Sequence, residues 1–310
     1  MTAQLVLLLL VVGSALETRR PVLALPVHAG WISSVAFSPD GTRIASGADD
    51  GAVKLWDART GKLLQTLTST SKGVTCLAFR PDGKQLVTGN WDATLRFWDI
   101  GTGKEAFTLR GHKESITCVA FSPDGKCLAS GSGDDSLKVW DSNSGKLSWT
   151  AELDDDYDIT CLAFSPDGKQ IATGDGEKRV TLWEVATGQE LRSLDGHEAA
   201  ISCVAFSPDG KRLVSGSWDD ALLVWDPVSG RKLHTLSGHE GDVSCVTFSP
   251  DGKHVFSGGE EGCVRIWDPH SGKGLSSWPA HGRGVTAVVC SPDGKSIASA
   301  SKGELKIWAR

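Results

Sequence analysis

One phrase recurs along the 310 residues of the chain: a short apolar segment followed by Ser-Pro-Asp-Gly or a close variant of it. The copies begin 42 or 43 positions apart, at Val35, Leu77, Val119, Leu162, Val204, Val246 and Val288. Tryptophans near the ends of the copies keep the same spacing, at Trp56, Trp98, Trp140, Trp183, Trp225, Trp267 and Trp308. Self-similarity at a fixed period indicates a fold built from stacked copies of one unit. These copies are numbered repeat 1 to repeat 7 below, and they fill nearly everything after residue 20.

Within each repeat, apolar and polar residues alternate over short segments, which is the period of a β-strand. Ser-Pro-Asp-Gly favours a tight turn after the first strand, because proline restricts φ and glycine accepts positive φ. In repeat 5, further strands are predicted at Lys211–Ser217, Ala221–Trp225 and Arg231–Leu236. A small sheet of four antiparallel strands with two apolar faces must stack against neighbouring copies. The sequence therefore predicts an all-β protein.

Two dipeptides mark the repeats more specifically. Gly-His occurs at Gly111-His112, Gly196-His197 and Gly238-His239, and Trp-Asp closes five of the seven repeats. Both dipeptides are typical of the WD-repeat β-propeller family, which the chain resembles over about nine-tenths of its length. The resemblance implies a seven-bladed β-propeller of four-stranded antiparallel blades around a central channel.

The two ends of the repeat region are complementary. Repeat 7 stops directly after its third strand, at Trp308-Ala309-Arg310, and so has no fourth strand of its own. Residues 21–26 precede His28 in the register that residues 191–194 have before His197. We therefore expect the N-terminal strand to close the ring by completing the last blade, which leaves only short, protected sheet edges. The expected propeller domain spans residues 21–310.

The family resemblance also implies a buried hydrogen-bonded network of His, Ser or Thr, Asp and Trp in each blade. A network repeated around a ring satisfies buried polar groups, so we interpret it as structural rather than hydrolytic. The matching residues are His28, Ser46, Asp50 and Trp56 in repeat 1, His112, Ser130, Asp134 and Trp140 in repeat 3, His197, Ser215, Asp219 and Trp225 in repeat 5, and His239, Ser257 and Trp267 in repeat 6.

Four repeats depart from this pattern. In repeat 6, Glu261 replaces the aspartate. Repeat 2 has Thr70 at the histidine position, and repeat 4 has Asp155 and Glu177 at the histidine and aspartate positions. Repeat 7 has Lys302 at the aspartate position. These departures put the networks of repeats 2, 4 and 7 in doubt.

Composition and cysteine placement exclude several classes of function. The chain is 40% hydrophobic and 23% charged with a formal net charge of −6, and it lacks the dense basic patch that nucleic-acid binding requires. Packed sheets lie about 10 Å apart, whereas a disulfide needs Cα atoms within about 7 Å. We therefore expect free buried thiols, with no metal and no cofactor. Five of the eight cysteines share one position in the repeat: Cys76, Cys118, Cys161, Cys203 and Cys245.

Residues 1–20 lie outside the repeats and differ from them in composition. Leu5 to Val12 is an apolar run, and Gly13-Ser14-Ala15 supplies small residues of the kind found at a signal cleavage site. These features favour an exported or periplasmic protein. The absence of Lys or Arg before the run and the unbridged cysteines favour the alternatives, a cytoplasmic protein or a short membrane-associating tail. The apolar stretch is shorter than the ~20 residues that span a bilayer.

Function is sought in the residues that break the repeat, because a fold alone implies none. In the family, the loops entering the first strands and the turns between second and third strands lie on one side of the ring, called the loop face below. Four aromatic residues that the repeat does not require fall there, and we interpret them as anchors of a binding surface. The candidate partner-binding residues are Trp31, Asp49, Trp91, Glu114, Tyr157, Asp158, Trp218, Asp242, Glu260 and Arg283.

Charge on the loop face indicates the kind of partner. Further carboxylates assigned to it are Asp154, Asp155, Asp156, Glu198 and Glu240, and its cations are Lys72, Lys113, Arg283 and Lys302. An acidic, aromatic face favours a protein or peptide rich in Lys or Arg. The opposite side, called the turn face, carries the Ser-Pro-Asp-Gly turns and a mixture of charges.

These observations predict a monomeric, non-catalytic interaction scaffold with no small-molecule substrate and no catalytic residues. An architectural or sensor module of a larger assembly is one alternative. An enzyme using a pocket on one face is another, and it would need an acid, base or metal cluster that departs from the repeat.

Overall fold

The computed structural model describes residues 19–68, 73–153 and 157–310. Residues 1–18 of the candidate signal segment, together with Thr70, Lys72, Asp154, Asp155 and Asp156, lie outside the described residues. Within the described ranges the chain forms strands and turns and contains no helix, so no helix there is long and apolar enough to cross a membrane. The prediction of an all-β protein is confirmed.

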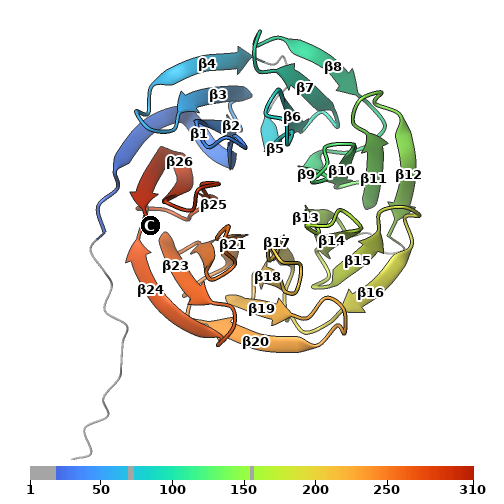
Figure 1. Cartoon of the computed structure of the whole chain (residues 1–310), viewed down its shortest axis with the longest axis vertical. Helices are drawn as coiled ribbons and strands as arrows, with labels where there is room; N and C mark the ends of the chain where they lie inside the picture. The colour runs from blue at the N-terminus through green and yellow to red at the C-terminus, as the bar shows by residue number, and fades with distance from the viewer. Residues whose placement is uncertain (1–18, 69–72, 154–156) are drawn as a thin grey trace, which may run out of the picture.

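The strands form antiparallel sheets that are arranged as the blades of a ring (Figure 1). The strands nearest the centre are β5 (Val74–Phe79), β9 (Ile116–Phe121), β13 (Ile159–Phe164), β17 (Ile201–Phe206), β21 (Val243–Phe248) and β25 (Ala287–Cys290). The second strands are β2 (Arg43–Ala48), β6 (Gln85–Asn90), β10 (Cys127–Ser132), β14 (Gln170–Asp175), β18 (Leu213–Ser217) and β22 (Val255–Gly259).

The third and fourth strands continue each sheet outward. The third strands are β3 (Ala52–Asp57), β7 (Leu95–Asp99), β11 (Ser136–Asp141), β15 (Val180–Glu184), β19 (Ala221–Trp225) and β23 (Cys263–Asp268). The fourth strands, at the circumference, are β4 (Leu63–Thr68), β8 (Glu105–Leu109), β12 (Leu147–Glu152), β16 (Glu190–Leu194), β20 (Lys232–Ser237) and β24 (Lys273–Pro279). The predicted four-stranded antiparallel blade is confirmed.

Two strands are much longer than the others, β1 (Leu23–Phe37) and β26 (Ser296–Ala309). β26 pairs with β25 through residues 297–300 and with β1 through residues 302–307, and β1 then pairs with β2. Hydrogen bonds thereby join six strands into one sheet, in the order β25-β26-β1-β2-β3-β4, beside five sheets of four strands. The described residues therefore form six hydrogen-bonded sheets where seven blades were expected. The count is lower because β26 occupies two strand positions of repeat 7 and β1 continues from repeat 7 into repeat 1.

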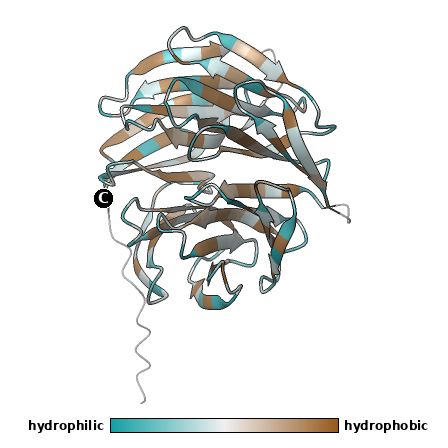
Figure 2. Cartoon of the chain, turned by 45° about the vertical axis from the view of Figure 1, so that its right-hand side comes forward, coloured by the Kyte–Doolittle hydropathy of each residue, from teal (hydrophilic) through white to brown (hydrophobic). Residues whose placement is uncertain are grey.

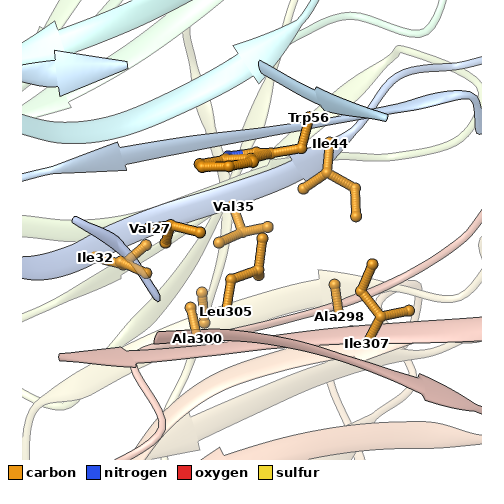
Figure 3. Close-up of a cluster of buried hydrophobic side chains, with 10 residues drawn as sticks. Val27, Ile32, Val35, Ile44, Trp56, Ala298, Ala300, Leu305 and Ile307 are labelled. Atoms are coloured by element: carbon orange, nitrogen blue, oxygen red, sulfur yellow. The ribbon is translucent and has the colours of Figure 1, made fainter. Parts of the chain in front are cut away.

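The expected pairing of the N-terminal segment with the last strand is observed. Leu23 lies opposite Ile307 and Leu25 lies opposite Leu305 in an antiparallel ladder. Close by, Val27, Leu305 and Ile307 belong to one buried apolar cluster that includes side chains from both β1 and β26 (Figure 3). This contact joins the two ends of the chain.

The core is divided among neighbouring repeats. Buried apolar side chains of the described residues form seven clusters, and each cluster contains residues of two adjacent repeats. Between repeats 4 and 5, for example, Leu182 and Leu194 share a cluster with Leu213 and Trp225. Hydrophobic residues accordingly follow the strands, while many of the turns are hydrophilic (Figure 2). Stacking between repeats supplies the burial that a single four-stranded sheet cannot provide alone.

The second strand of repeat 5 begins two residues later than predicted, at Leu213 instead of Lys211. The turn before it explains the difference. The backbone N–H of Lys211 donates to the carboxylate of Asp209, and that of Arg212 donates to the hydroxyl of Ser207. The Asp209 carboxylate thus holds the Lys211 N–H in the turn, whereas the bond to the serine hydroxyl recurs in repeats 1 and 3, where the equivalent residues Arg43 and Cys127 begin their strands.

Hydroxyl groups near the centre of the ring link consecutive repeats, which the sequence pattern alone does not reveal. The Ser33 hydroxyl donates to the carbonyl of Val74 in the next repeat, and the Thr286 hydroxyl donates to the carbonyl of Ile32 at 2.6 Å. Equivalent bonds join Thr117 to Ile159, Thr160 to Ile201 and Ser202 to Val243. Their signal in the sequence is a Ser or Thr at one position of all seven repeats: Ser33, Thr75, Thr117, Thr160, Ser202, Ser244 and Thr286.

Changing Thr286 to Val should lower the free energy of unfolding by about 0.5–1.5 kcal/mol, because it removes the hydroxyl donor between repeats 7 and 1 while nearly preserving side-chain shape. Thr75 provides a matched control, since within the described ranges its hydroxyl contacts only the Sγ of Cys76, at 3.5 Å. Urea denaturation should show a smaller loss for Thr75→Val. Equal losses would contradict a special role for the bond between the chain ends.

Candidate functional site

In repeat 5, four side chains form one directional hydrogen-bonded chain. Nε1 of Trp225 donates to Oγ of Ser215 at 2.8 Å. Oγ of Ser215 lies 2.7 Å from Nε2 of His197, and Nδ1 of His197 lies 2.8 Å from the Asp219 carboxylate. Because an ionised carboxylate only accepts, Nδ1 carries the proton and Nε2 accepts from the serine hydroxyl. Every polar atom along the chain is therefore used.

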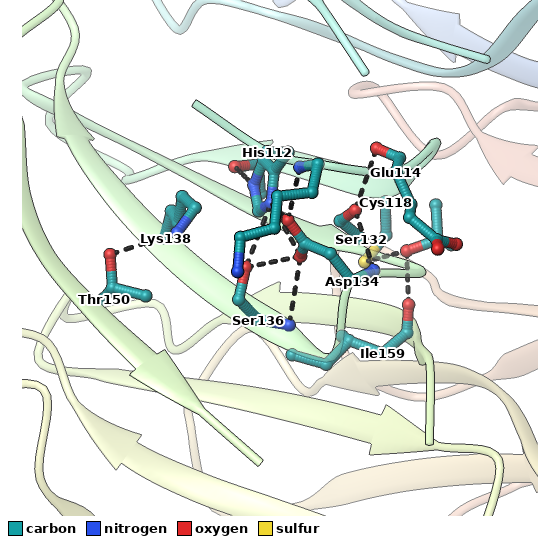
Figure 4. Close-up of polar contacts among 12 residues, drawn as sticks. His112, Glu114, Cys118, Ser132, Asp134, Ser136, Lys138, Thr150 and Ile159 are labelled. Carbon is teal, nitrogen blue, oxygen red and sulfur yellow. Dashed lines mark hydrogen bonds and ion pairs between the residues drawn. The ribbon is translucent and has the colours of Figure 1, made fainter. Parts of the chain in front are cut away.

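The same contacts occur in repeats 1 and 3. In repeat 3, Nε2 of His112 lies 2.8 Å from Oγ of Ser130, and Nδ1 lies 3.0 Å from the Asp134 carboxylate. Ser136, which the repeat pattern does not single out, donates a further hydrogen bond to Asp134 (Figure 4). In repeat 1, Asp50 is less buried than expected, with its side chain 24% exposed.

In repeat 1, Ser46 completes the network with His28 and Trp56 at 2.8 and 3.0 Å. In repeat 3, Trp140 donates to Ser130 at 2.9 Å. These bonds place the His, Ser and Trp of both repeats in the predicted network.

Repeat 7, whose network the sequence puts in doubt, has a complete one. Nε2 of His281 lies 2.8 Å from Oγ of Ser299, which also accepts from Nε1 of Trp308 at 2.8 Å. Nδ1 of His281 lies 3.0 Å from the carboxylate of Glu304. Glu304 follows Lys302 by two residues, and its longer side chain reaches the place that an aspartate occupies in other repeats. Lys302 itself is exposed.

Repeat 6 accepts a similar substitution at the predicted aspartate position. The Glu261 carboxylate lies 2.6 Å from Nδ1 of His239, and Nε2 of His239 lies 2.6 Å from Oγ of Ser257. Nε1 of Trp267 donates to Ser257 at 2.8 Å. The longer carboxylate thus preserves the network.

Repeats 2 and 4 retain only part of the network among their described residues. Trp98 donates to Thr88 at 3.2 Å, and Trp183 donates to Thr173 at 2.8 Å. The histidine positions, Thr70 and Asp155, lie outside the described residues. Glu177, at the aspartate position of repeat 4, donates its backbone N–H to Asp175.

In repeat 2, the buried Arg96 side chain binds two carboxylates instead. It lies 2.9 Å from Asp92 and 3.1 Å from Glu105. An ion-pair network therefore occupies this part of a repeat that has no histidine in the network.

Burial controls the protonation of these networks. Burial lowers the pKa of His197, which outweighs the opposite influence of Asp219, and the same holds for His28, His112 and His281 with their own carboxylates. The histidines are therefore neutral at neutral pH. Both ring nitrogens are occupied, which leaves no free base for a substrate and supports a structural role.

The carboxylates stay ionised for a related reason. Burial alone would raise the pKa of Asp134, but hydrogen bonds from Ser136, the Lys113 N–H and His112 lower it to about 2. Burial likewise opposes, and hydrogen bonds produce, the lowered pKa values of Asp219 and Glu304. These acids accept structural hydrogen bonds throughout the neutral range.

A recurring backbone hydrogen bond brings the variable positions of the loop face together in pairs. The Asp49 N–H donates to the carbonyl of Trp31 at 3.1 Å, and the Glu260 N–H donates to the carbonyl of Asp242 at 3.0 Å. Equivalent bonds run from Trp91 to Gly73, from Gly133 to Ser115, from Gly176 to Asp158 and from Trp218 to Ala200. In each of these repeats, the residue that directly follows the second strand therefore lies beside the loop that enters the first strand.

Three tryptophans are exposed among the described residues, and all three belong to this face. Trp91 and Trp218 are each 55% exposed, and Trp31 is 37% exposed. Of the other candidates, Glu114, Asp158, Glu260 and Arg283 are exposed, whereas Asp49, Tyr157 and Asp242 are half-buried. Exposed indole rings beside carboxylates suit contact with a protein surface.

The candidate residues do not form a single pocket. Trp91 follows β6 and Trp218 follows β18, and these strands lie on opposite sides of the ring (Figure 1). Glu114 and Asp158 come together elsewhere, where both carboxylates approach the position that a Cβ on Gly133 would take, at 3.4 and 3.5 Å. A ligand contacting all of them must be as wide as the ring, as a protein or an extended peptide is.

The turn face contains cavities between consecutive Ser-Pro-Asp-Gly turns. One of about 420 Å³ is lined by Asp209 and Arg212 with Asp251 and Lys253. The turn aspartates are already engaged: a hydrogen bond from Ser207 lowers the pKa of Asp209, and one from Ser249 together with Arg310 lowers the pKa of Asp251 to about 2. These carboxylates stabilise turns and are poor candidates for acid–base chemistry.

Cysteines and acids likewise provide no recognisable metal centre in the described part of the chain, where no group of three or more His, Cys, Asp or Glu side chains could hold an ion. All eight cysteines are free, and Cys127, Cys263 and Cys290 are half-buried. Burial raises the pKa of Cys76, Cys118 and Cys203 to about 12. Such thiols are inert nucleophiles and pack as small apolar groups.

Comparison with known families agrees with the repeat assignment. The sequence profile described as "WD domain, G-beta repeat" matches residues 19–57, 61–99, 103–141, 147–184, 188–226, 230–268 and 272–309. The chain belongs to the WD40-repeat family. The seven matched segments together cover nearly all of residues 19–309.

Individual WD40-repeat relatives resemble the chain over about one repeat. The small ribosomal subunit protein RACK1z of Arabidopsis thaliana is 52% identical over 44 residues, 14% of each chain. Ribosome assembly protein 4 of Saccharomyces cerevisiae is 41% identical over 51 residues, 16% of this chain and 10% of its own. The guanine nucleotide-binding protein subunit beta of Oryza sativa subsp. indica is 55% identical over 38 residues, 12% of this chain and 10% of its own. These matches span a small fraction of each relative.

Proposed function

We propose that this WD40-repeat protein is a non-catalytic interaction scaffold that binds a Lys- or Arg-rich protein segment on its loop face. One observation carries the proposal: all three exposed tryptophans of the described chain lie on that face, among exposed carboxylates. Aromatic rings supply contact area and cation–π partners, and carboxylates attract cations. The separation of Trp91 and Trp218 across the ring favours a protein or an extended peptide over a small molecule.

The chemistry of the polar networks favours a scaffold over an enzyme. The Ser and His side chains that could be taken for a hydrolytic pair are committed to Trp and carboxylate partners in repeat after repeat. The names of the similar proteins, a small ribosomal subunit protein, a ribosome assembly protein and a subunit of a guanine nucleotide-binding protein, describe parts or builders of assemblies. That likeness also supports the second candidate, an architectural module within a larger assembly.

We further propose that residues 21–310 form one domain, a monomeric ring of seven blades. In this interpretation the six-stranded sheet comprises two blades, those of repeats 7 and 1, which share the long strands β1 and β26. The seven apolar clusters, each between two adjacent repeats, support this count. The bond from Thr286 to Ile32 supports it as well, because it repeats between the chain ends a contact found between other repeats.

Binding of a fluorescein-labelled peptide of alternating glycine and lysine, eight residues long, tests the proposed function. Fluorescence anisotropy should show binding that weakens as salt rises, because exposed charges are screened over about 8–10 Å at physiological ionic strength. Replacing Trp91 by Ala should weaken binding several-fold through loss of a cation–π contact. Replacing Glu114 by Gln and Asp158 by Asn together should mainly slow association.

Two controls test whether binding depends on the charge of the peptide and on the loop face. A peptide with glutamine in place of lysine should bind much more weakly, and Leu275→Ala, which changes an exposed residue of the outer strand β24, should leave affinity unchanged. If the affinity does not change with salt concentration or with the substitutions of Trp91, Glu114 and Asp158, the proposal of a basic ligand is wrong. Absence of any binding by the peptide, with partners captured at another surface, would favour the architectural alternative.

A further inference from the structure

One sector of the loop face, formed by repeats 7, 1 and 2, holds two of the exposed tryptophans, Trp31 and Trp91, close to Asp49. The Asp49 side chain folds over Gly30, where an added Cβ would lie 1.6 Å from Oδ1. Gly30 directly precedes Trp31. The Trp91 ring packs over Gly73, where an added Cβ would lie 3.0 Å from the ring and 3.3 Å from the Asp49 carbonyl oxygen. Asp49 therefore lies between Trp31 and Trp91.

A cation of the chain itself already occupies part of this sector. Nζ of Lys302 lies 5.9 Å from the centre of the Trp31 ring, within the range of a cation–π contact. The backbones of the two residues are paired between β1 and β26, which fixes the base of the lysine beside the indole. Lys302 is exposed and makes no ion pair with any described residue, so the indole is its one recognised partner.

We infer that Lys302 occupies, within the chain, the place that a partner's lysine or arginine would take on Trp31, and that it thereby limits affinity on the loop face. This inference rests on the proposed function of that face. The lysine or arginine of a basic segment must then bind beside Asp49 and Trp91, or displace Lys302 from Trp31. Because the competitor is covalently attached, its effective concentration stays high whatever the partner's concentration is.

The inference predicts that removing the Lys302 charge raises the affinity for a basic peptide, and that this gain depends on Trp31. Replacing Lys302 by Met preserves an unbranched apolar stem and removes the charge, so the lysine peptide should bind more tightly, by about threefold or more. Removing any cation from an acidic face also strengthens attraction of a basic peptide through long-range electrostatics. Arg283→Met controls for that effect, because Arg283 is an exposed cation of repeat 7 on the same face. Lys302→Met should exceed it.

A double-mutant cycle with Trp31 isolates the competition. In a Trp31→Ala background, the gain from Lys302→Met should shrink to that of Arg283→Met, because the contested ring is gone. The measurement is the dissociation constant of the fluorescein-labelled glycine–lysine peptide for wild type, the three single variants and the two double variants. Thermal unfolding of each variant confirms that the ring is intact, and Lys302→Gln provides a second neutral side chain if Lys302→Met is unstable.

The outcomes separate the two proposals. If wild type binds the peptide through Trp91 but Lys302→Met and Arg283→Met have equal effects in both backgrounds, competition by Lys302 is refuted and the proposed function stands. If only the Lys302 variants bind, competition is supported and is strong. If neither wild type nor the Lys302 variants bind, both proposals fail.

Discussion

Deleting residues 1–26 should destabilise the protein severely, whereas deleting residues 1–18 should leave its stability nearly unchanged. The longer deletion removes the segment that pairs with β26 and uncovers Leu305 and Ile307, now 0% and 4% exposed. Loss of burial for two such side chains corresponds to about 3–6 kcal/mol, a large part of the 5–15 kcal/mol by which a typical domain is stable. It also leaves an unpaired sheet edge that invites aggregation. The shorter deletion keeps Arg19, whose guanidinium lies 4.8 Å from the Trp278 ring.

Thermal unfolding of the two truncations measures this difference, and point variants test it at full length. Leu25→Asn places a polar group against Leu305 in the ladder and should lower the unfolding midpoint clearly. Val22→Asn is the matched control, because Val22 is 63% exposed and should tolerate the change. Similar midpoints for the two truncations, together with a silent Leu25→Asn, would show that the N-terminal strand does not hold the ring together.

Stability should fall steeply as pH decreases from about 6.5 toward 5. His112, His197 and His281 have folded-state pKa values lowered by burial, and His28 shares the direction. Below about pH 6.5 the unfolded chain takes up protons that the folded chain resists, so the unfolded state is favoured. Each such histidine contributes at most about 1.4 kcal/mol per pH unit, and several act together. Protonating Nε2 would also deprive the serine hydroxyl of its acceptor.

Urea denaturation at pH 8, 7, 6 and 5 measures this dependence. Replacing His197 by Gln should lower stability at pH 7.5 but flatten the slope below pH 6.5, because one titrating group is removed. The network carboxylates, with lowered pKa values, contribute in the same direction only at more acidic pH. A flat profile between pH 8 and 5 would show that burial does not lower the pKa values of these four histidines in the folded state.

Patterns within single repeats were sufficient to predict several features. Alternation of apolar and polar residues predicted the strands, and Ser-Pro-Asp-Gly predicted the turns, because both depend on backbone geometry over a few residues. Pairing of residues 21–26 with repeat 7 followed from register alone. The His–Ser–Trp contacts of repeats 1, 3, 5 and 6 were expected from the resemblance to the WD-repeat family, and the similar local structure of these repeats places the three side chains at similar distances.

Other features depended on contacts that a repeat pattern does not contain. Glu304 replaces the missing aspartate of repeat 7 because a longer side chain reaches the same point from a different residue. The carbonyl groups that accept hydrogen bonds from the Ser and Thr hydroxyls lie in the next repeat, so only the stacking of the sheets reveals them. Two loop-face tryptophans that look equivalent in the sequence lie on opposite sides of the ring, whereas Trp31 meets Lys302 across 271 positions of chain.

By itself, the sequence determined the repeating unit with its strands and turns, because these arise from interactions within one unit that recurs seven times, and its resemblance to a known family added most of the polar network. Tertiary structure alone decided how β1 and β26 merge two units into one sheet, which carboxylate serves repeat 7, and which loop-face residues share a sector. Those outcomes depend on side-chain length, on the curvature of the ring and on distances between units, none of which a one-dimensional pattern encodes.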